Sequence, residues 1–154
     1  KKPTIIQTGW MTNDVNQLNL KKTNNSLQFL HICGKSVNKQ TQSIIDCWSS
    51  IEWGDLEKPK LIVRYSPNHV NINEVECNTI EYIRDELSEK ALYKLMNNSD
   101  VHICCSKAEG FGHFIQEAKA SSSVVLTTNG SPMNEFVSKN SGFLINVSKK
   151  KKNK

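Results

Sequence analysis

Two carboxylates stand eight residues apart in a short stretch that also contains two glycines. The stretch is CSKAEGFGHFIQEAKA, residues 105–120, in which Glu109 precedes the glycines and Glu117 lies in the apolar segment that follows them. Carboxylates accept charge-assisted hydrogen bonds from vicinal hydroxyl groups such as those of a ribose. This spacing therefore suggests a site that grips a ligand carrying sugar hydroxyls.

The glycines predict how the backbone meets such a ligand. VHICC, residues 101–105, predicts a strand, and a helix is predicted to start near Gly112. Glycine lets the backbone approach a ligand closely, and the first N–H groups of a helix lack partners within the helix. Such a turn suits a phosphate or diphosphate. Glu117, about five residues into the helix, would lie roughly 7–8 Å from its start, which is about the reach from a diphosphate to a ribose.

The residues by themselves leave a second interpretation open. A glutamate near the start of a helix is common because the helix dipole stabilises it, and two glycines can serve only to form the turn. On chemistry alone, the segment is either a ligand site or an ordinary connection between a strand and a helix.

The rest of the chain alternates predicted strands with predicted helices. The strands are expected at 27–33, 60–65, 79–83, 101–105, 122–128 and 142–147. The helices are expected at 39–53, 89–98, 112–120 and 132–139. This alternation predicts right-handed βαβ units, and so an α/β, Rossmann-like fold with a mostly parallel sheet and helices on both faces. Ligands of such sheets bind at the carboxyl ends of the strands, where the glutamate stretch is placed.

Length and charge indicate one domain with a basic end. The 154 residues predict a domain at 27–147, a lead-in segment at 1–26 and a basic tail at 148–154. The tail holds five lysines, so the formal charge of +5 becomes +5 − 5 = 0 without it, and we expect no nucleic-acid partner. The five cysteines are odd in number and have no C-x-x-C spacing. This cysteine pattern predicts reduced thiols and no metal site. Together with the lack of an apolar run of membrane-spanning length and of a signal peptide, it predicts a cytoplasmic protein.

The sequence EGFGHFIQEA, residues 109–118, resembles the E-x7-E motif of the large retaining class of GT-B glycosyltransferases. Three other stretches are similar to the carboxy-terminal domain of that family: FLHICGKSVNKQTQSIIDCW, LSEKALYKLMNNSDVHICCSKAEGFG and VVLTTNGSPMNEFV. The resemblance covers residues 27–147. It implies one half of a GT-B fold, the domain that binds the nucleotide sugar.

The resemblance also implies a role for each residue of the motif. Glu109 would be the catalytic residue that contacts the transferred sugar, and Glu117 would bind the ribose of the nucleotide. The backbone between them would meet the diphosphate or the sugar, through Gly110, Phe111, Gly112 and His113. For the His113 side chain two interpretations stay open, a hydrogen bond to the ligand or an ordinary surface histidine.

Three further side chains are implied in donor binding. Lys35 and Lys39 match the basic pair that neutralises the diphosphate as the leaving group develops charge, with Lys39 one residue closer to Lys35 than is usual. Glu135 would line the donor pocket. Because lysines and a helix terminus neutralise the diphosphate, the implied mechanism uses no metal and no cofactor beyond the nucleotide diphosphate sugar.

The implied function is transfer of a hexose from a UDP- or GDP-sugar, with retained anomeric configuration, to an acceptor that the sequence leaves open. A complete enzyme of this kind has an N-terminal Rossmann-like domain, which we expect in the same chain and without which this domain would be inactive. Two other functions remain open: a non-catalytic nucleotide or nucleotide-sugar binding module, and an adaptor that binds anionic polymers through the basic tail.

Overall fold

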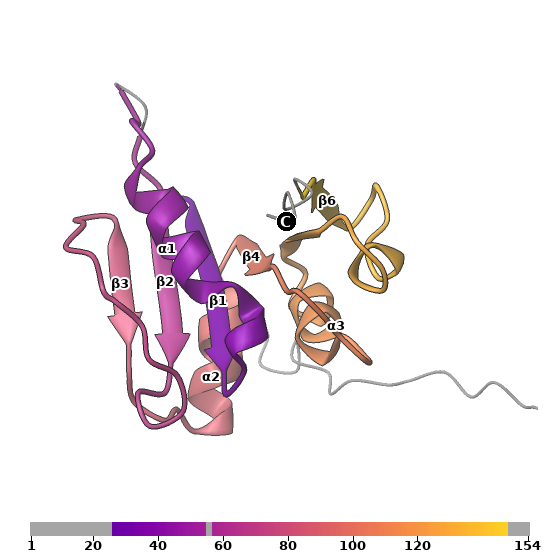
Figure 1. Ribbon diagram of the computed structural model, residues 1–154, viewed down its shortest axis with the longest axis horizontal. Helices are drawn as coiled ribbons and strands as arrows, with labels where there is room; N and C mark the ends of the chain where they lie inside the picture. The colour runs from indigo at the N-terminus through magenta and orange to yellow at the C-terminus, as the bar shows by residue number, and fades with distance from the viewer. Residues whose placement is uncertain (1–25, 55–56, 148–154) are drawn as a thin grey trace, which may run out of the picture.

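The sheet is six-stranded and parallel throughout, in the order β3-β2-β1-β4-β5-β6 (Figure 1). A computed structural model describes residues 26–54 and 57–147. The strands are β1 (Gln28–Gly34), β2 (Lys60–Tyr65), β3 (Ile80–Ile83), β4 (Val101–Cys104), β5 (Val124–Thr128) and β6 (Gly142–Ile145). The predicted α/β, Rossmann-like class is confirmed. The basic tail and nearly all of the lead-in segment lie outside the described residues.

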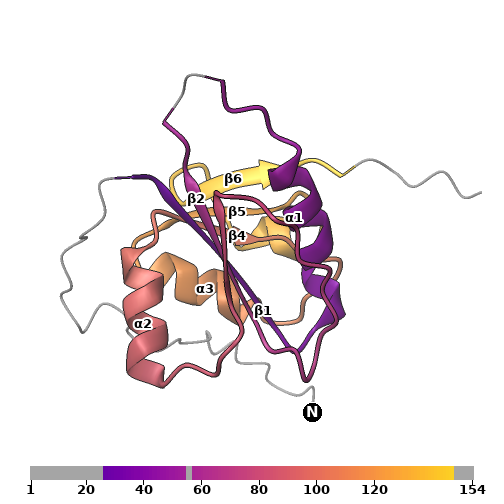
Figure 2. The same ribbon diagram turned by 90° about the vertical axis from the view of Figure 1, so that its left-hand side faces the viewer.

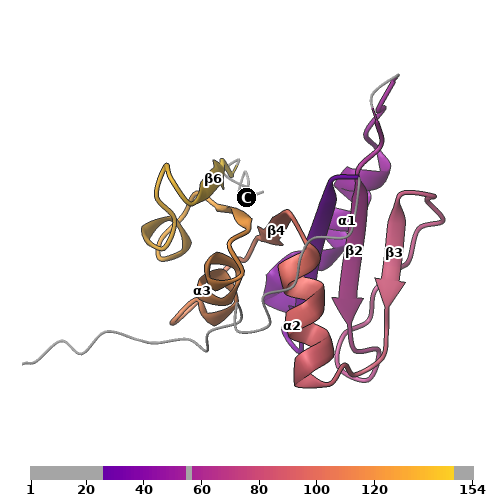
Figure 3. The same cartoon turned by 180° about the vertical axis from the view of Figure 1, so that it is seen from behind.

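The α-helices of the described residues cover both faces of this sheet. They are α1 (Thr41–Ser49), α2 (Glu89–Asn98) and α3 (His113–Ala120). Seen edge-on in Figure 2, α1 lies on one face and α2 and α3 lie on the other. The view from behind in Figure 3 shows α2 in front of β1 and β2, with α3 beside it.

The face under α1 carries the largest core cluster. Ile45 of α1 is fully buried, as are Leu61 and Val63 of β2, and these side chains pack together with Trp48. Successive residues of a strand point to opposite faces, so alternate apolar residues of β2 face α1. This packing holds α1 against β1 and β2, and with it the loop that leads into α1.

The opposite face is built from two smaller clusters. Leu30 of β1 and Ile62 of β2 pack against Met96 of α2. Ile115 of α3 and Val125 of β5 are fully buried in the second cluster. The second cluster packs α3 against β4 and β5, so the glutamate stretch leads into a helix with a defined position.

The first helix is shorter than the predicted 39–53. A 3-10 turn, η2 (Val37–Lys39), comes first, and Gln40 with φ 58 separates it from α1. A left-handed residue interrupts helical geometry, so α1 begins only at Thr41. The apolar pattern runs on to Trp53 because that ring packs on Trp48 from the following loop, with centroids 5.1 Å apart. The prediction was wrong at both ends of this helix because apolar spacing reported packing and not backbone conformation.

The helix predicted at 132–139 is also wrong. The structure has a single 3-10 turn there, η3 (Met133–Glu135). Met133 and Val137 are both buried against the α3 cluster. Their burial accounts for the apolar residues of this segment without a full helix.

Candidate functional site

The site lies where the direction of strand addition reverses. From β1 the chain adds β2 and β3 on one side, whereas β4, β5 and β6 follow on the other. The pairing of β1 with β4, with Phe29 opposite Val101, therefore brings the loop after β1 beside the loop after β4. In open parallel sheets this crevice at the carboxyl ends is where ligands bind.

The loop after β1 carries the two predicted lysines in different settings. Ser36 begins the 3-10 turn, and its hydroxyl accepts a hydrogen bond from the Asn38 backbone N–H at 3.2 Å. Lys35 lies before this turn and is exposed. Lys39 lies at its end and is largely buried, with 13% of its side chain exposed. The turn therefore directs one of the two ammonium groups toward the loop after β4.

Lys39 contacts the first glutamate of the motif. Its Nζ lies 2.5 Å from Oε1 of Glu109, whose side chain is 14% exposed. The same Nζ lies 3.0 Å from the centroid of the Phe114 ring, in cation–π geometry. The structure thus brings together two residues 70 positions apart that the sequence assigned to one site. Phe114 was missed, and its signal was an aromatic residue in the first turn after the glycines.

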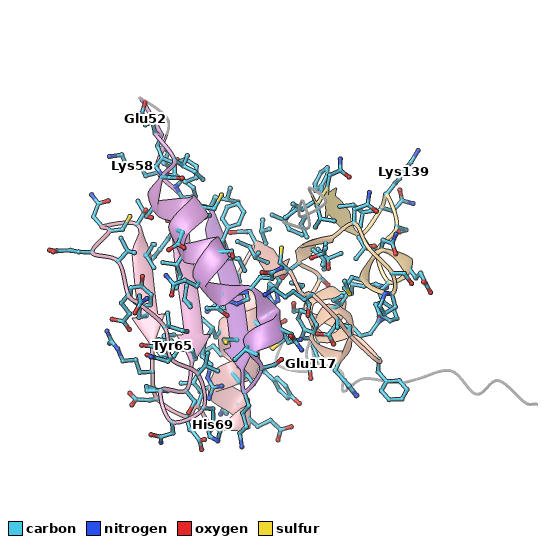
Figure 4. The ribbon with its side chains drawn as sticks, in the orientation of Figure 1. Glu52, Lys58, Tyr65, His69, Glu117 and Lys139 are labelled. Atoms are coloured by element: carbon cyan, nitrogen blue, oxygen red, sulfur yellow. The ribbon has the colours of Figure 1, made fainter. Side chains whose placement is uncertain are left out.

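Glu117 lies on the α3 side of the same crevice and is partly buried. Burial raises the pKa of its carboxyl, and the charges of His113 and Lys39 act in the opposite direction. His113 is exposed and lies one helical turn before Glu117. Figure 4 shows Glu117 at the end of the molecule where α1 begins, between the α1 side and the α3 side. The two carboxylates and Lys39 therefore share one electrostatic environment.

The glutamate loop is fastened to the lysine loop through backbone atoms. The Lys107 N–H donates to the Asn38 carbonyl at 2.9 Å. The Ser106 hydroxyl shares its hydrogen between the Ala108 carbonyl at 2.8 Å and the Asn38 carbonyl at 3.2 Å. The Ser106 N–H donates to the Thr128 hydroxyl at 3.1 Å. Sequence reasoning missed these contacts. Ser106 could have been noticed as a serine directly after a buried strand. The role of the Asn38 carbonyl could not be predicted, because every residue has a backbone carbonyl.

The turn into α3 requires a glycine at its last position. Gly112 has φ +61, and a Cβ there would lie 2.8 Å from the Phe136 ring. Gly110 has open space around it, since a Cβ there would have no atom within 4 Å. Phe111 is 63% exposed. The tip of the turn is therefore open to a ligand while its base is packed tightly.

The structure does not place Glu135 against the other predicted site residues. It lies in η3 after β5, is exposed, and its Oε1 accepts a hydrogen bond from the Ser131 hydroxyl at 2.7 Å. Its part in donor binding stays a prediction.

A buried histidine supports both loops from below. Nδ1 of His31 lies 2.8 Å from the Ile103 carbonyl of β4, and Nε2 lies 2.8 Å from the Thr41 hydroxyl of α1. Burial lowers the pKa of His31 to about 4. The neutral ring therefore donates from Nδ1 to the carbonyl and accepts the Thr41 hydroxyl at Nε2. His102 of β4 is buried as well, and its Nε2 lies 3.1 Å from the Met96 carbonyl of α2.

Metal centres and membrane spans are both absent from the described residues. No group of three or more His, Cys, Asp and Glu side chains among them is arranged to hold a metal ion. Likewise, no helix in this part of the chain has the length and apolarity needed to cross a membrane.

Comparison with known proteins finds a similarity in the carboxy-terminal part of the chain. Residues 82–153, which include the glutamate motif, match the family described as Glycosyl transferases group 1. These residues are therefore similar to part of a group 1 glycosyltransferase. A comparison of the chain with curated proteins found no match.

Several solved structures share the fold of this chain. The C-terminal domain of a group 1 family protein from Francisella tularensis matches with TM-score 0.57 and 19% identity, over 77% of this chain and 67% of that one. The GtfA/B complex matches with TM-score 0.59 and 13% identity, over 83% of this chain and 26% of that one. A trehalose-6-phosphate structure from E. coli, bound with UDP-2-fluoro glucose, matches with TM-score 0.52 and 12% identity, over 68% of this chain and 30% of that one.

These matches establish the architecture of a GT-B carboxy-terminal domain. These structures have 12–19% sequence identity with this chain, and what they share with it is the fold. The chain spans less than a third of the two longer proteins, at 26% and 30% of their lengths.

Proposed function

We propose that the chain is the donor-binding domain of a retaining hexosyltransferase and that it holds a nucleotide diphosphate sugar at the β1–β4 crevice. The observation that carries this proposal is the contact of Lys39 with Glu109 beside Glu117. A cation and two carboxylates at a strand-to-helix turn match what a diphosphate flanked by two sugars requires.

Each part of the donor has a partner in this arrangement. Glu117 accepts hydrogen bonds from the ribose hydroxyls, and Glu109 accepts them from the transferred sugar. Lys39 and the exposed Lys35 neutralise the diphosphate, and the backbone from Gly110 to His113 lies along it. A UDP- or GDP-sugar is the expected donor, and the UDP-2-fluoro glucose bound to the E. coli structure of the same fold supports this class of ligand.

The chemistry follows from charge development on the diphosphate. When the bond between the sugar and the diphosphate breaks, negative charge grows on the leaving oxygen, and lysines placed beforehand stabilise that charge. This arrangement uses no metal ion. The acceptor and its activating groups would come from an N-terminal Rossmann-like domain, so the domain alone binds donor without efficient transfer.

The proposal is tested by calorimetric titration of UDP, GDP and ADP, and of UDP-glucose and GDP-mannose, into the 154-residue chain. One base should bind, and Glu117→Ala should weaken that binding by about 1–3 kcal/mol because a charged hydrogen-bond acceptor for the ribose is lost. Glu81→Ala is the matched control, because Glu81 lies on β3 and pairs with Lys60 outside the crevice.

Two results would contradict the donor site. One is a folded chain that binds none of the five ligands. The other is binding that Glu117→Ala and Glu81→Ala affect equally, because the ribose would then not depend on the crevice.

A second candidate function is a non-catalytic module that binds a nucleotide or nucleotide sugar. It needs only the residues of this crevice, where Lys39 contacts Glu109 beside Glu117. Sugar transfer by a longer form of the chain distinguishes the enzyme from the module. The adaptor hypothesis depends on the tail at 148–154, which lies outside the described residues, and it stays a prediction.

A further inference from the structure

We propose that the Lys39–Glu109 ion pair makes the site select an intact nucleotide sugar over the corresponding nucleoside diphosphate. This inference rests on the proposed function and adds a determinant of specificity to it. In the empty site Lys39 and Glu109 bind each other. In the occupied site Lys39 would bind the diphosphate of the donor and Glu109 would bind its sugar.

The pair is held more firmly than a surface ion pair. Both side chains are largely buried, at 13% and 14% exposure, and the Nζ–Oε1 distance is 2.5 Å. The Phe114 ring lies 3.0 Å from the ammonium on another side. The Lys107 N–H bond to Asn38 joins the two loops beside the pair. Breaking the contact therefore leaves a charged group in a place with little water, which is unfavourable unless a new partner arrives.

A nucleoside diphosphate supplies a new partner to only one member of the pair. Its phosphate oxygens attract the Lys39 ammonium. If Lys39 moves to them, the Glu109 carboxylate is left unpaired beside a diphosphate of the same sign. If Lys39 stays, the diphosphate lacks that cation. Either arrangement weakens binding of the nucleoside diphosphate.

A nucleotide sugar supplies partners to both members. Its phosphates again attract Lys39, while the hydroxyls of the sugar donate hydrogen bonds to the Glu109 carboxylate. There is room for the sugar, because a Cβ placed on the adjacent Gly110 would have no atom within 4 Å. After transfer the sugar is gone, and the re-formed pair favours release of the nucleoside diphosphate.

The test measures how Glu109→Gln and Lys39→Met change the binding of UDP against UDP-glucose, and of GDP against GDP-mannose. In Glu109→Gln, Lys39 is free for the diphosphate, so the nucleoside diphosphate should bind about fivefold more tightly, the effect of removing one competing ion pair. The nucleotide sugar should bind more weakly, because the sugar loses its charged acceptor. Wild type should therefore prefer the nucleotide sugar, and the variant should lose or reverse that preference.

The double variant separates the ion pair from the general effect of removing a negative charge. In a Lys39→Met background, Glu109→Gln should no longer tighten binding of the nucleoside diphosphate, because no pair remains to be released. Glu117→Gln removes the same charge from the same crevice and should weaken both ligands.

The two levels of failure are distinguishable. A folded wild-type chain that binds none of the four ligands would overturn the proposed function and this inference with it. Nucleotide binding that depends on Glu117 but is weakened or unchanged by Glu109→Gln would overturn the inference alone. In that case Glu109 would hold Lys39 in place for the diphosphate instead of competing for it. A tightening that persists in the Lys39→Met background would also overturn it.

Discussion

The two loops of the site lead into their helices in the same backbone conformation but with different residues. Gln40 precedes α1 with φ 58, and Gly112 precedes α3 with φ 61. Neither N-cap makes a side-chain capping hydrogen bond. A left-handed conformation strains any residue with a Cβ, so the first loop tolerates a strain that the second avoids.

The surroundings of the two residues explain this difference. A Cβ on Gly112 would collide with the Phe136 ring, which closes the base of the glutamate turn. Gln40 borders an open groove between α1 and β5, where its side chain meets no such barrier. Left-handed geometry is thus common to both helix starts, while packing decides where only glycine is allowed.

The largest expected effect comes from His31, which joins the two sides of the site by linking Thr41 of α1 to Ile103 of β4. Its pKa is about 4 in the fold, against an ordinary 6.5, so the unfolded chain takes up the proton first as pH falls. The stabilisation is therefore fully present above about pH 6.5 and is lost between pH 6.5 and pH 4. The free energy of unfolding should fall by about 3 kcal/mol across that window from this residue.

Urea unfolding at pH 7 and at pH 4.5 measures this effect. His31→Gln keeps a donor and an acceptor but does not titrate, so the difference between the two pH values should shrink by most of that amount. His69→Gln is the control, because His69 is exposed and bonded to Ser66 in a different loop. An unchanged pH dependence in His31→Gln would show that burial does not keep the His31 ring neutral in the fold.

The next effect sharpens the contrast at the glutamate turn. Gly112→Ala adds a Cβ in a left-handed conformation and 2.8 Å from the Phe136 ring, and should reduce the free energy of unfolding by about 2 kcal/mol. Gly110→Ala is the matched control two positions earlier, where a Cβ has open space. Equal losses in chemical denaturation of the two variants would contradict the packing explanation.

The smallest effect concerns the lysine loop and has the opposite sign. Gln40→Gly removes the strain of the left-handed N-cap and should raise the free energy of unfolding by about 0.5–1 kcal/mol. Ser43→Gly lies in the interior of α1, where glycine is unfavourable, and should be slightly destabilising. The same denaturation experiment compares them, and a destabilised Gln40→Gly would mean that the Gln40 side chain contributes contacts that outweigh the strain.

Much of the fold could be predicted because its signals are local. Residues 60–65 are bounded correctly as β2, and Ser88 caps α2 as its position before a helical pattern indicates. The region around Gln40 could not be predicted, since its residue type does not announce a left-handed conformation. Trp53 made the predicted helix too long, because an apolar residue in a loop can pack on a helix as well as a residue within that helix can.

The order of strands and helices and the spacing of Glu109 and Glu117 can be read from the residues alone, because apolar spacing and carboxylate chemistry are local properties of the chain. The contacts of Lys39 with Glu109 and with the Phe114 ring, and the link that His31 makes between α1 and β4, arise only when the sheet is assembled. Contacts between residues about 70 positions apart depend on the pairing of β1 with β4, and that pairing follows from the packing of the whole sheet.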